Sequence, residues 1–163
     1  EAVKQDLYSI AYINRPSEKV QLEAVKNDGI NIRYINNPSE KVQIEAVKEN
    51  GLAIVYINNP SEEVKLIAAK SDGSVIRYMN NPSTEIQLIS VKKDGYNIQY
   101  ISNPSVEVQL EAIKQSCKAI IYISNPCKEV QDMVNIIKCE NRILYVLKLE
   151  DGSYRFSLSL IHI

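Results

Sequence analysis

Apolar and polar positions along the chain recur with a period of 22 residues. In the unit that starts at Asn37, a polar turn precedes the apolar positions Val42, Ala46 and Val47, and a second apolar segment follows Gly51. The same order recurs around all six prolines of the chain, Pro16, Pro38, Pro60, Pro82, Pro104 and Pro126. A fixed period of about 20 to 50 residues is typical of solenoid repeats, and these units lack the period-two alternation of strands. The pattern therefore predicts a helical repeat array.

The sequence of each repeat predicts a first helix with well-defined ends. Asn37 suits the N-cap, Pro38 the first helical position and Glu40 the acidic position of a capping box. The helix is expected to end near Glu49. Gly51 then fits the C′ position, where left-handed backbone costs glycine least.

A second helix of about two turns is expected from Leu52 to Ile57, because the residue before a proline avoids helical angles. The predicted fold is all-α, a right-handed α-solenoid of 22-residue helix-turn-helix repeats. About six and a half repeats occupy residues 1–147, and a divergent C-terminal segment occupies 148–157. The apolar run that begins at Arg142 predicts a short hairpin, a cap or a further helix pair.

The composition removes several classes of protein. The chain of 163 residues has 20 acids and 19 Lys plus Arg, and its net charge of −1 argues against general binding to polyanions. No apolar run approaches the ~20 residues of a membrane span, and no charged-then-apolar leader opens the chain. Three cysteines without a C-x-x-C pair suit a reducing compartment, so we expect a cytoplasmic protein with no membrane partner.

Both ends indicate a fragment. The chain begins at Glu1 inside a repeat, so the N-terminal cap and neighbouring domains are expected to be missing. Residues 158–163 match the translation of a transposon mosaic end that is used to prepare sequencing libraries. We therefore expect this tail to be an adapter artefact, which leaves the only histidine, His162, without biological meaning.

The groups that catalysis needs are scarce. Apart from His162 there is no histidine for acid–base work, and no Gly-rich phosphate loop or nucleophile elbow occurs. Cys117 and Cys139 take equivalent positions in adjacent repeats, which predicts that they are too far apart to bridge. We therefore expect a protein that is not an enzyme and that uses no cofactor and no metal.

One polar column falls inside the apolar arc of the first helix. It contains Gln21, Gln43, Gln87, Gln109 and Gln131, with Lys65 as the exception. A buried glutamine must be hydrogen-bonded. The column is interpreted as a structural ladder that satisfies backbone groups of the turns, and a row that binds a polar ligand is the alternative.

A tyrosine column and two variable columns lie on the second helix. Repeat arrays commonly keep their packing columns constant and vary the recognition face. A mixture of apolar, aromatic and Arg side chains resembles a protein-binding surface. For the tyrosine column alone, packing between repeats with the hydroxyls at the surface is the favoured interpretation, and an aromatic binding platform is the alternative. The candidate face comprises Ile30, Arg33, Tyr34, Leu52, Val55, Tyr56, Ser74, Arg77, Tyr78, Tyr96, Gln99 and Tyr100.

A lysine row provides a second candidate surface. It comprises Lys26, Lys48, Lys70, Lys92 and Lys114. Such a row can follow a phosphate backbone, but Glu23, Glu45 and Glu111 lie one turn away and partly neutralise it. We therefore expect a non-catalytic scaffold for protein–protein interaction with an unidentified protein partner. Binding of nucleic acid along the lysine row is the less favoured alternative.

The repeat also resembles a known family. The phrase Asn-Pro-Ser-Glu-x-Val-Gln-Leu-x-Ala-Val-Lys-x-x-Gly-x-x-Ile-x-Tyr-Ile spans most columns of residues 2–139. It resembles a family of uncharacterised helical repeats, a domain of unknown function in bacterial, phage and giant-virus proteins. The resemblance implies an α-helical repeat and offers no catalytic residue to carry over. The cysteines at the Gly column, Cys117 and Cys139, and the residues after Arg142 depart from it.

Overall fold

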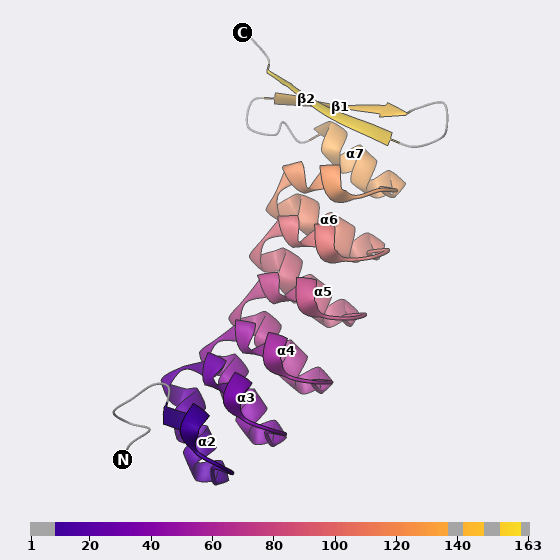
Figure 1. Cartoon of the computed structure of the whole chain (residues 1–163). Helices are drawn as coiled ribbons and strands as arrows, with labels where there is room; N and C mark the ends of the chain where they lie inside the picture. Colours follow the sequence, from indigo (N-terminus) through magenta and orange to yellow (C-terminus); the bar gives the residue numbers. More distant parts are fainter. Residues whose placement is uncertain (1–8, 137–141, 149–153, 161–163) are drawn as a thin grey trace. The chain divides into compact units, whose positions relative to one another are not determined.

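The computed structural model describes residues 9–136, 142–148 and 154–160, with side chains described up to residue 132. The chain divides into two compact units, Glu1–Pro82 and Ser83–Ile163. Each unit repeats an α-helix followed by a short 3-10 helix (Figure 1). The predicted helical repeat solenoid is confirmed, and its handedness stays a prediction.

The α-helices are the first helices of the repeats. They are α2 (Glu18–Asn27), α3 (Glu40–Glu49) and α4 (Glu62–Ser71) in the first unit, and α5 (Thr84–Lys93), α6 (Val106–Gln115) and α7 (Lys128–Ile136) in the second. The 3-10 helices are η1 (Ser9–Tyr12), η2 (Gly29–Tyr34), η3 (Gly51–Tyr56) and η4 (Gly73–Tyr78), then η5 (Gly95–Tyr100) and η6 (Cys117–Tyr122).

The second helix is therefore a 3-10 helix, whereas the sequence suggested two ordinary turns. The Asn50 side chain accepts a hydrogen bond from the Leu52 N–H at 3.0 Å, and the Ile57 N–H closes the other end on the Ile54 carbonyl at 3.1 Å. Six residues complete two turns only with three residues per turn. Because residues i and i+3 eclipse in a 3-10 helix, Leu52 and Val55 lie along one edge.

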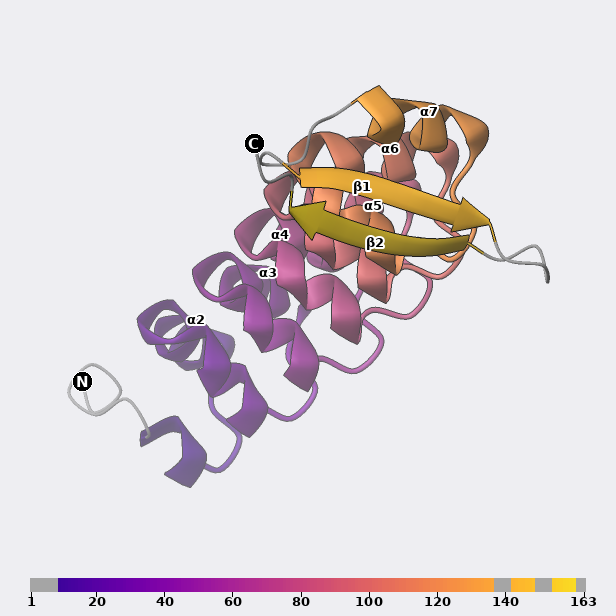
Figure 2. The same cartoon turned by 90° about the horizontal axis from the view of Figure 1, so that it is seen from above.

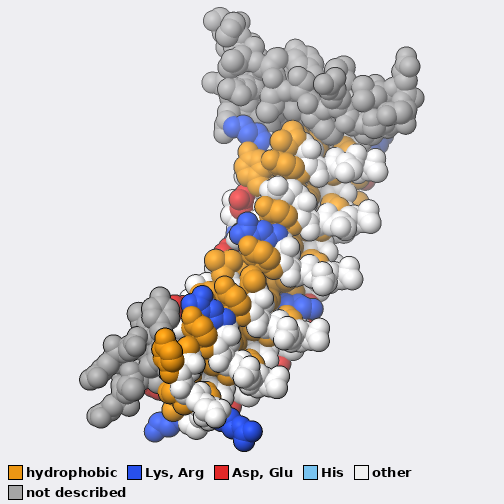
Figure 3. Space-filling model, viewed as in Figure 1, with side chains coloured by type: hydrophobic (Ala, Val, Ile, Leu, Met, Phe, Trp, Pro, Cys, Tyr) orange, Lys and Arg blue, Asp and Glu red, His pale blue; other side chains and the backbone are white. Residues whose placement is uncertain are grey.

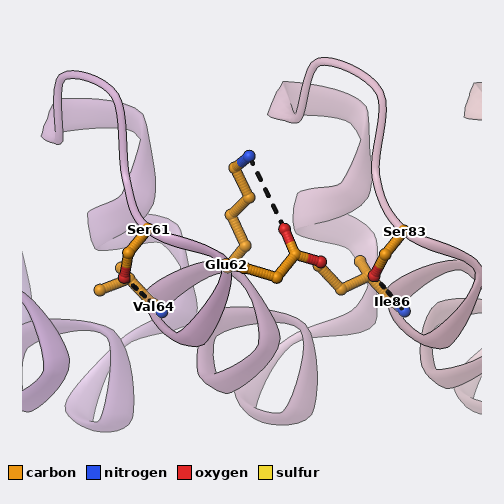
Figure 4. Close-up of polar contacts among 6 residues, drawn as sticks. Ser61, Glu62, Val64, Ser83 and Ile86 are labelled. Carbon is orange, nitrogen blue, oxygen red and sulfur yellow. Dashed lines mark hydrogen bonds and ion pairs between the residues drawn. The ribbon is translucent and has the colours of Figure 1, made fainter.

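The start of the α-helix also differs from the prediction. Ser61 is the N-cap of α4, and its hydroxyl accepts a hydrogen bond from the Val64 N–H at 3.3 Å (Figure 4). Asn37, which was expected to cap α3, instead has a φ of 49°. Asparagine tolerates this left-handed backbone better than most residues. It therefore turns the chain before the proline, and the serine two residues later starts the helix.

The repeat glycines serve close packing, so the predicted left-handed C′ role is wrong. A Cβ atom on Gly29 would lie 2.3 Å from the Ala46 carbonyl oxygen in the next repeat, and φ there is not left-handed. On Gly51 the corresponding distance, to the Ala68 carbonyl oxygen, is 2.9 Å. The Gly29 N–H donates to the Glu49 carboxylate at 2.7 Å. Glycine is needed because one repeat lies against the backbone of the next.

The core lies between a layer of α-helices and a layer of 3-10 helices. In the first unit α3 contacts α2, α4 and both flanking 3-10 helices, and η3 contacts η2 and η4. Val42, Ala46 and Val47 on α3 and Ala53 on η3 are completely buried, and Ile54 is nearly so. In the second unit α6 makes the same kinds of contact with α5, α7, η5 and η6. Each repeat thus buries its apolar face against its neighbours.

Hydrogen bonds within and between the repeats confirm the structural ladder predicted for the glutamine column. The Gln43 amide donates to the Pro38 carbonyl at 3.0 Å. Gln109 does the same to Pro104, and its oxygen accepts from the Cys127 N–H of the next repeat at 3.2 Å. These bonds provide partners for backbone groups of the proline turns that have none within the helices.

Buried asparagines add polar contacts that the sequence interpretation missed. Asn31 on η2 is only 2% exposed, and its amide donates to the Ala24 carbonyl at 3.0 Å. Asn97 donates in the same way to the Ser90 carbonyl in the second unit. At the equivalent position η3 has Ala53. These amides are second donors to carbonyls that already accept the backbone N–H of the C-cap residues of α2 and α5.

A hairpin follows the last described helix. A hairpin was one of the three structures predicted for the apolar run that begins at Arg142. Strands β1 (Arg142–Lys148) and β2 (Tyr154–Leu160) pair antiparallel, and β1 contacts α7 (Figure 2). Strand β1 begins at Arg142, inside the range assigned to the array, 1–147. Strand β2 crosses position 158, where the adapter tail was expected to start. His162 lies outside the described residues.

The structure describes two of the three cysteines. Cys117 is disulfide-bonded, whereas Cys127 is free. Cys139, the third cysteine, lies outside the described residues. The prediction that Cys117 and Cys139 are too far apart to bridge therefore involves a residue outside the described part of the chain. The disulfide at Cys117 weakens the cysteine-based argument for a reducing compartment.

Candidate protein-binding face

In the first unit, the exposed edges of η2, η3 and η4 bring together most of the predicted face. We call this surface the 3-10 face. It comprises Ile30, Arg33, Tyr34, Leu52, Val55, Tyr56, Ser74, Arg77 and Tyr78. Tyr56 and Val55 are 46% and 48% exposed, and Leu52 is half-buried. The two variable columns are three residues apart, so they would lie about 60° apart on an α-helix, whereas in a 3-10 helix they eclipse and share one edge.

Each arginine on the 3-10 face stacks on the tyrosine that follows it. The Arg33 guanidinium carbon lies 4.5 Å from the centre of the Tyr34 ring, and the Arg77 carbon lies 4.8 Å from the Tyr78 ring. Arg33 also donates a hydrogen bond to the Tyr34 hydroxyl. Stacking of this kind holds the cation over an aromatic face.

Two tyrosines influence the pKa of Arg33. Desolvation lowers this pKa, but hydrogen bonds and charge interactions with Tyr34 and Tyr56 outweigh it and raise the pKa above its ordinary value. Tyr56 belongs to the repeat after that of Arg33. The cation is therefore linked to the tyrosines of two successive repeats and stays charged at every physiological pH.

A series of three hollows runs along the 3-10 face, one for each pair of successive repeats. Their volumes are about 590, 390 and 470 Å³ in chain order. The middle hollow is lined by Arg33 from one repeat, by Tyr56 from the next, and by Asn36, Pro38 and Gln43. The other two contain the equivalent positions. In each hollow, the residue at the position of Arg33, the asparagine-proline turn after it and the tyrosine of the next repeat thus form the same depression.

Charge is segregated between the two sides of the first unit. Every acid in residues 9–82 lies in an α-helix or caps the start of a 3-10 helix. The charged residues of these 3-10 helices and of the turns after them are three cations, Arg15, Arg33 and Arg77. Figure 3 shows a face of the molecule on which Lys and Arg lie among hydrophobic side chains and acids are sparse. The 3-10 face is therefore cationic although the chain is nearly neutral.

The predicted residues of the second unit make different contacts. The Tyr96 ring packs edge-to-face on Tyr122 of the next repeat, with centroids 5.9 Å apart. The Gln99 amide donates to the Tyr96 carbonyl at 3.0 Å. Tyr100 is 40% exposed. This unit repeats the exposed tyrosine, but it has no arginine in the column of Arg33 and Arg77.

The alternative lysine row lies on the α-helices and is partly paired. Lys48 forms an ion pair with Glu45 at 3.0 Å, and Lys114 forms one with Glu111 at 3.8 Å. The hydrogen bond from Lys48 lowers the pKa of Glu45 below its ordinary value. Lys26, Lys70 and Lys92 are exposed. Two of the five lysines thus have an acid of their own helix as partner.

Within the described parts of the chain, no three His, Cys, Asp or Glu side chains come together to hold a metal ion. Over the same residues, no helix has the length and apolar character that crossing a membrane requires.

The sequence interpretation missed the hollows. It assigned the Asn-Asn-Pro turns to helix starts and did not consider that Asn36 and Asn58 line a surface depression. The recurrence of two asparagines where one suffices for a turn was the available signal. A comparison with protein-family models, with curated proteins and with solved structures finds no match to this chain, so the resemblance to the uncharacterised repeat family stays a prediction.

Proposed function

We propose that the protein is a non-catalytic scaffold that binds a protein partner through the 3-10 face. The observation that carries the proposal is the series of hollows between exposed tyrosines, with Arg33 and Arg77 stacked on their rings. Tyrosine and arginine are enriched where proteins bind one another, because both offer large contact area together with hydrogen-bond donors. Packing between repeats does not require these side chains to be exposed.

The lysine row supports the nucleic-acid alternative less well. Lys48 and Lys114 are paired with glutamates of the same helix. Phosphate binding would have to replace these pairs, and it gains less from a neutralised cation. The proposal therefore ranks the 3-10 face first.

A matched pair of triple variants tests the proposal. Peptides are selected from a displayed random library on the parent protein, and their affinities are measured by fluorescence anisotropy. The face variant carries Arg33→Ala, Val55→Ala and Arg77→Ala, and the control carries Lys26→Ala, Lys48→Ala and Lys70→Ala. Both must keep the parent's helical circular dichroism. We expect the face variant to lose about tenfold or more in affinity and the control to change less than about twofold.

Two results would contradict the proposal. One is a set of selected peptides that bind the parent and the face variant equally. The other is tight binding of labelled single- or double-stranded DNA that weakens log-linearly with salt and is lost in the lysine variant. The second result would establish the alternative.

A further inference from the structure

Three equivalent positions of the first unit present a charged, an apolar and a charged side chain in that order. These positions are Arg33, Val55 and Arg77, one in each of three successive repeats, and all three side chains are exposed. Neither arginine takes part in an ion pair among the residues that the structure describes. A partner with complementary chemistry therefore offers an acid, an apolar group and an acid at the same intervals.

The spacing of the repeats selects the conformation of such a partner. Helices packed side by side lie about 8 to 10 Å apart, so Arg33 and Arg77 lie two such steps apart. Three residues of polyproline II helix advance about 9.3 Å, and its three residues per turn direct i, i+3 and i+6 to one side. A β-strand directs i and i+3 to opposite sides, and an α-helix needs about six residues to cover one step.

The hollows supply partners for the backbone of an extended peptide. Asn36 and Asn58 are exposed and line the middle hollow beside Tyr56. A carboxamide donates to a peptide carbonyl and accepts from a peptide N–H. Polyproline II has no internal hydrogen bonds, so its backbone groups are available for such contacts, and it binds to aromatic-lined grooves. One hollow per repeat thus corresponds to one turn of the peptide.

We infer that the 3-10 face binds an acidic peptide segment in the polyproline II conformation. The segment carries carboxylates six residues apart, which pair with Arg33 and Arg77, and an apolar residue midway, which contacts Val55 and Tyr56. The inference rests on the proposed function and specifies its ligand.

The test uses the peptides selected on the parent protein and a second selection on an Arg33→Gln, Arg77→Gln variant. We expect the first pool to be enriched in acid-x-x-apolar-x-x-acid sequences and the second pool to lose this pattern. A labelled synthetic peptide of the enriched sequence should bind the double Gln variant about tenfold more weakly than the parent. The Arg33→Lys, Arg77→Lys variant keeps the charge and should retain most of the affinity, which excludes a general loss of structure.

The other outcomes separate the inference from the proposed function. Peptides that require Val55 and Tyr56 but show no acidic spacing overturn the inference and leave the scaffold proposal intact. Peptides with helical i, i+4 spacing, or a circular dichroism spectrum of the bound peptide without polyproline II character, also overturn the inference alone. Displacement of the peptide by an oligonucleotide with the same arginine dependence assigns the face to phosphate. Peptides whose affinity is unchanged by substitution of both arginines and of Val55 contradict the inference and the proposed function together.

Discussion

The outward sides of α3 and η3 belong to the same repeat and cover the same core, yet they carry charge differently. On α3, Lys48 is held by Glu45 at 3.0 Å within the helix. On the neighbouring 3-10 helices, Arg33 and Arg77 are held by tyrosine rings, which place the cation without neutralising it. The difference indicates that surface charge alone does not identify a binding side. What matters is whether the structure already provides the counter-charge.

The two sides also differ in how their backbone groups find partners. The α-helix is long enough to satisfy most of its own groups, whereas the 3-10 helix depends on its neighbours and caps. Gly29 at the start of η2 lies against the Ala46 carbonyl, and Asn31 is bonded to the Ala24 carbonyl. The 3-10 face is therefore positioned by contacts with the preceding and following α-helices, and disturbing those contacts is the most direct way to alter it.

The largest expected effect comes from Gly29→Ala. The new Cβ atom would meet the Ala46 carbonyl oxygen at 2.3 Å, so one of the two backbones must shift. We expect a loss of about 2 to 3 kcal/mol in the free energy of unfolding, measured by urea denaturation followed by circular dichroism. Gly51→Ala, with its closest contact at 2.9 Å, serves as the graded comparison and should cost less. Equal costs for the two variants would contradict the role given to close approach.

An intermediate effect is expected in the glutamine column. Gln43→Ala leaves the Pro38 carbonyl without its 3.0 Å donor and should cost about 1 to 2 kcal/mol in unfolding free energy. At the exceptional position, Lys65 forms an ion pair with Glu62 at 3.9 Å (Figure 4). We expect Lys65→Gln to stabilise the protein by about 0.5 to 1 kcal/mol, because it adds the bond to the Pro60 carbonyl. If Lys65→Gln instead destabilised the protein, glutamine would not have the same role at every position of the column.

The smallest effect concerns the paired charges of the α side. Glu45 has a folded-state pKa below its ordinary value, so its stabilisation is present above that ordinary value and is lost as the pH falls through the folded pKa. The Lys48 side chain is 54% exposed and the Glu45 side chain 29%, so solvent screens the pair and Glu45→Gln should cost only about 0.3 to 0.5 kcal/mol at pH 7. The difference from the parent in urea denaturation should vanish at about pH 3. An equal difference at both pH values would show that the carboxylate charge is not responsible.

The sequence predicted the repeat and its packing columns because these depend on period and polarity. The residues that line the core of α3 and the bond from Gln43 to the Pro38 carbonyl follow from that pattern. It did not predict the 3-10 geometry of η3. An apolar segment of six residues is compatible with either kind of helix, and the choice is made by the Asn50 cap and by packing on neighbouring repeats.

The candidate site was predicted as a set of residues but not as a shape. Arg33 was named from a variable column and Tyr34 and Tyr56 from the constant tyrosine column beside it, and the structure places them around one hollow or beside it. The hollow itself depends on the left-handed turn at Asn37, which a pattern of residue types does not specify. The disulfide at Cys117 was not predicted either, because a pattern of columns does not show which cysteines come together.

The bond from the Gly29 N–H to Glu49 has a consequence for synthesis of the protein. It reaches only 20 residues along the chain, and the element contacts of the first unit likewise join neighbouring repeats. A repeat that leaves the ribosome can therefore complete its packing as soon as the following repeat has emerged. At about 5 to 20 residues per second this takes on the order of one to four seconds. Folding can keep pace with translation, and apolar surface is exposed mainly at the growing end.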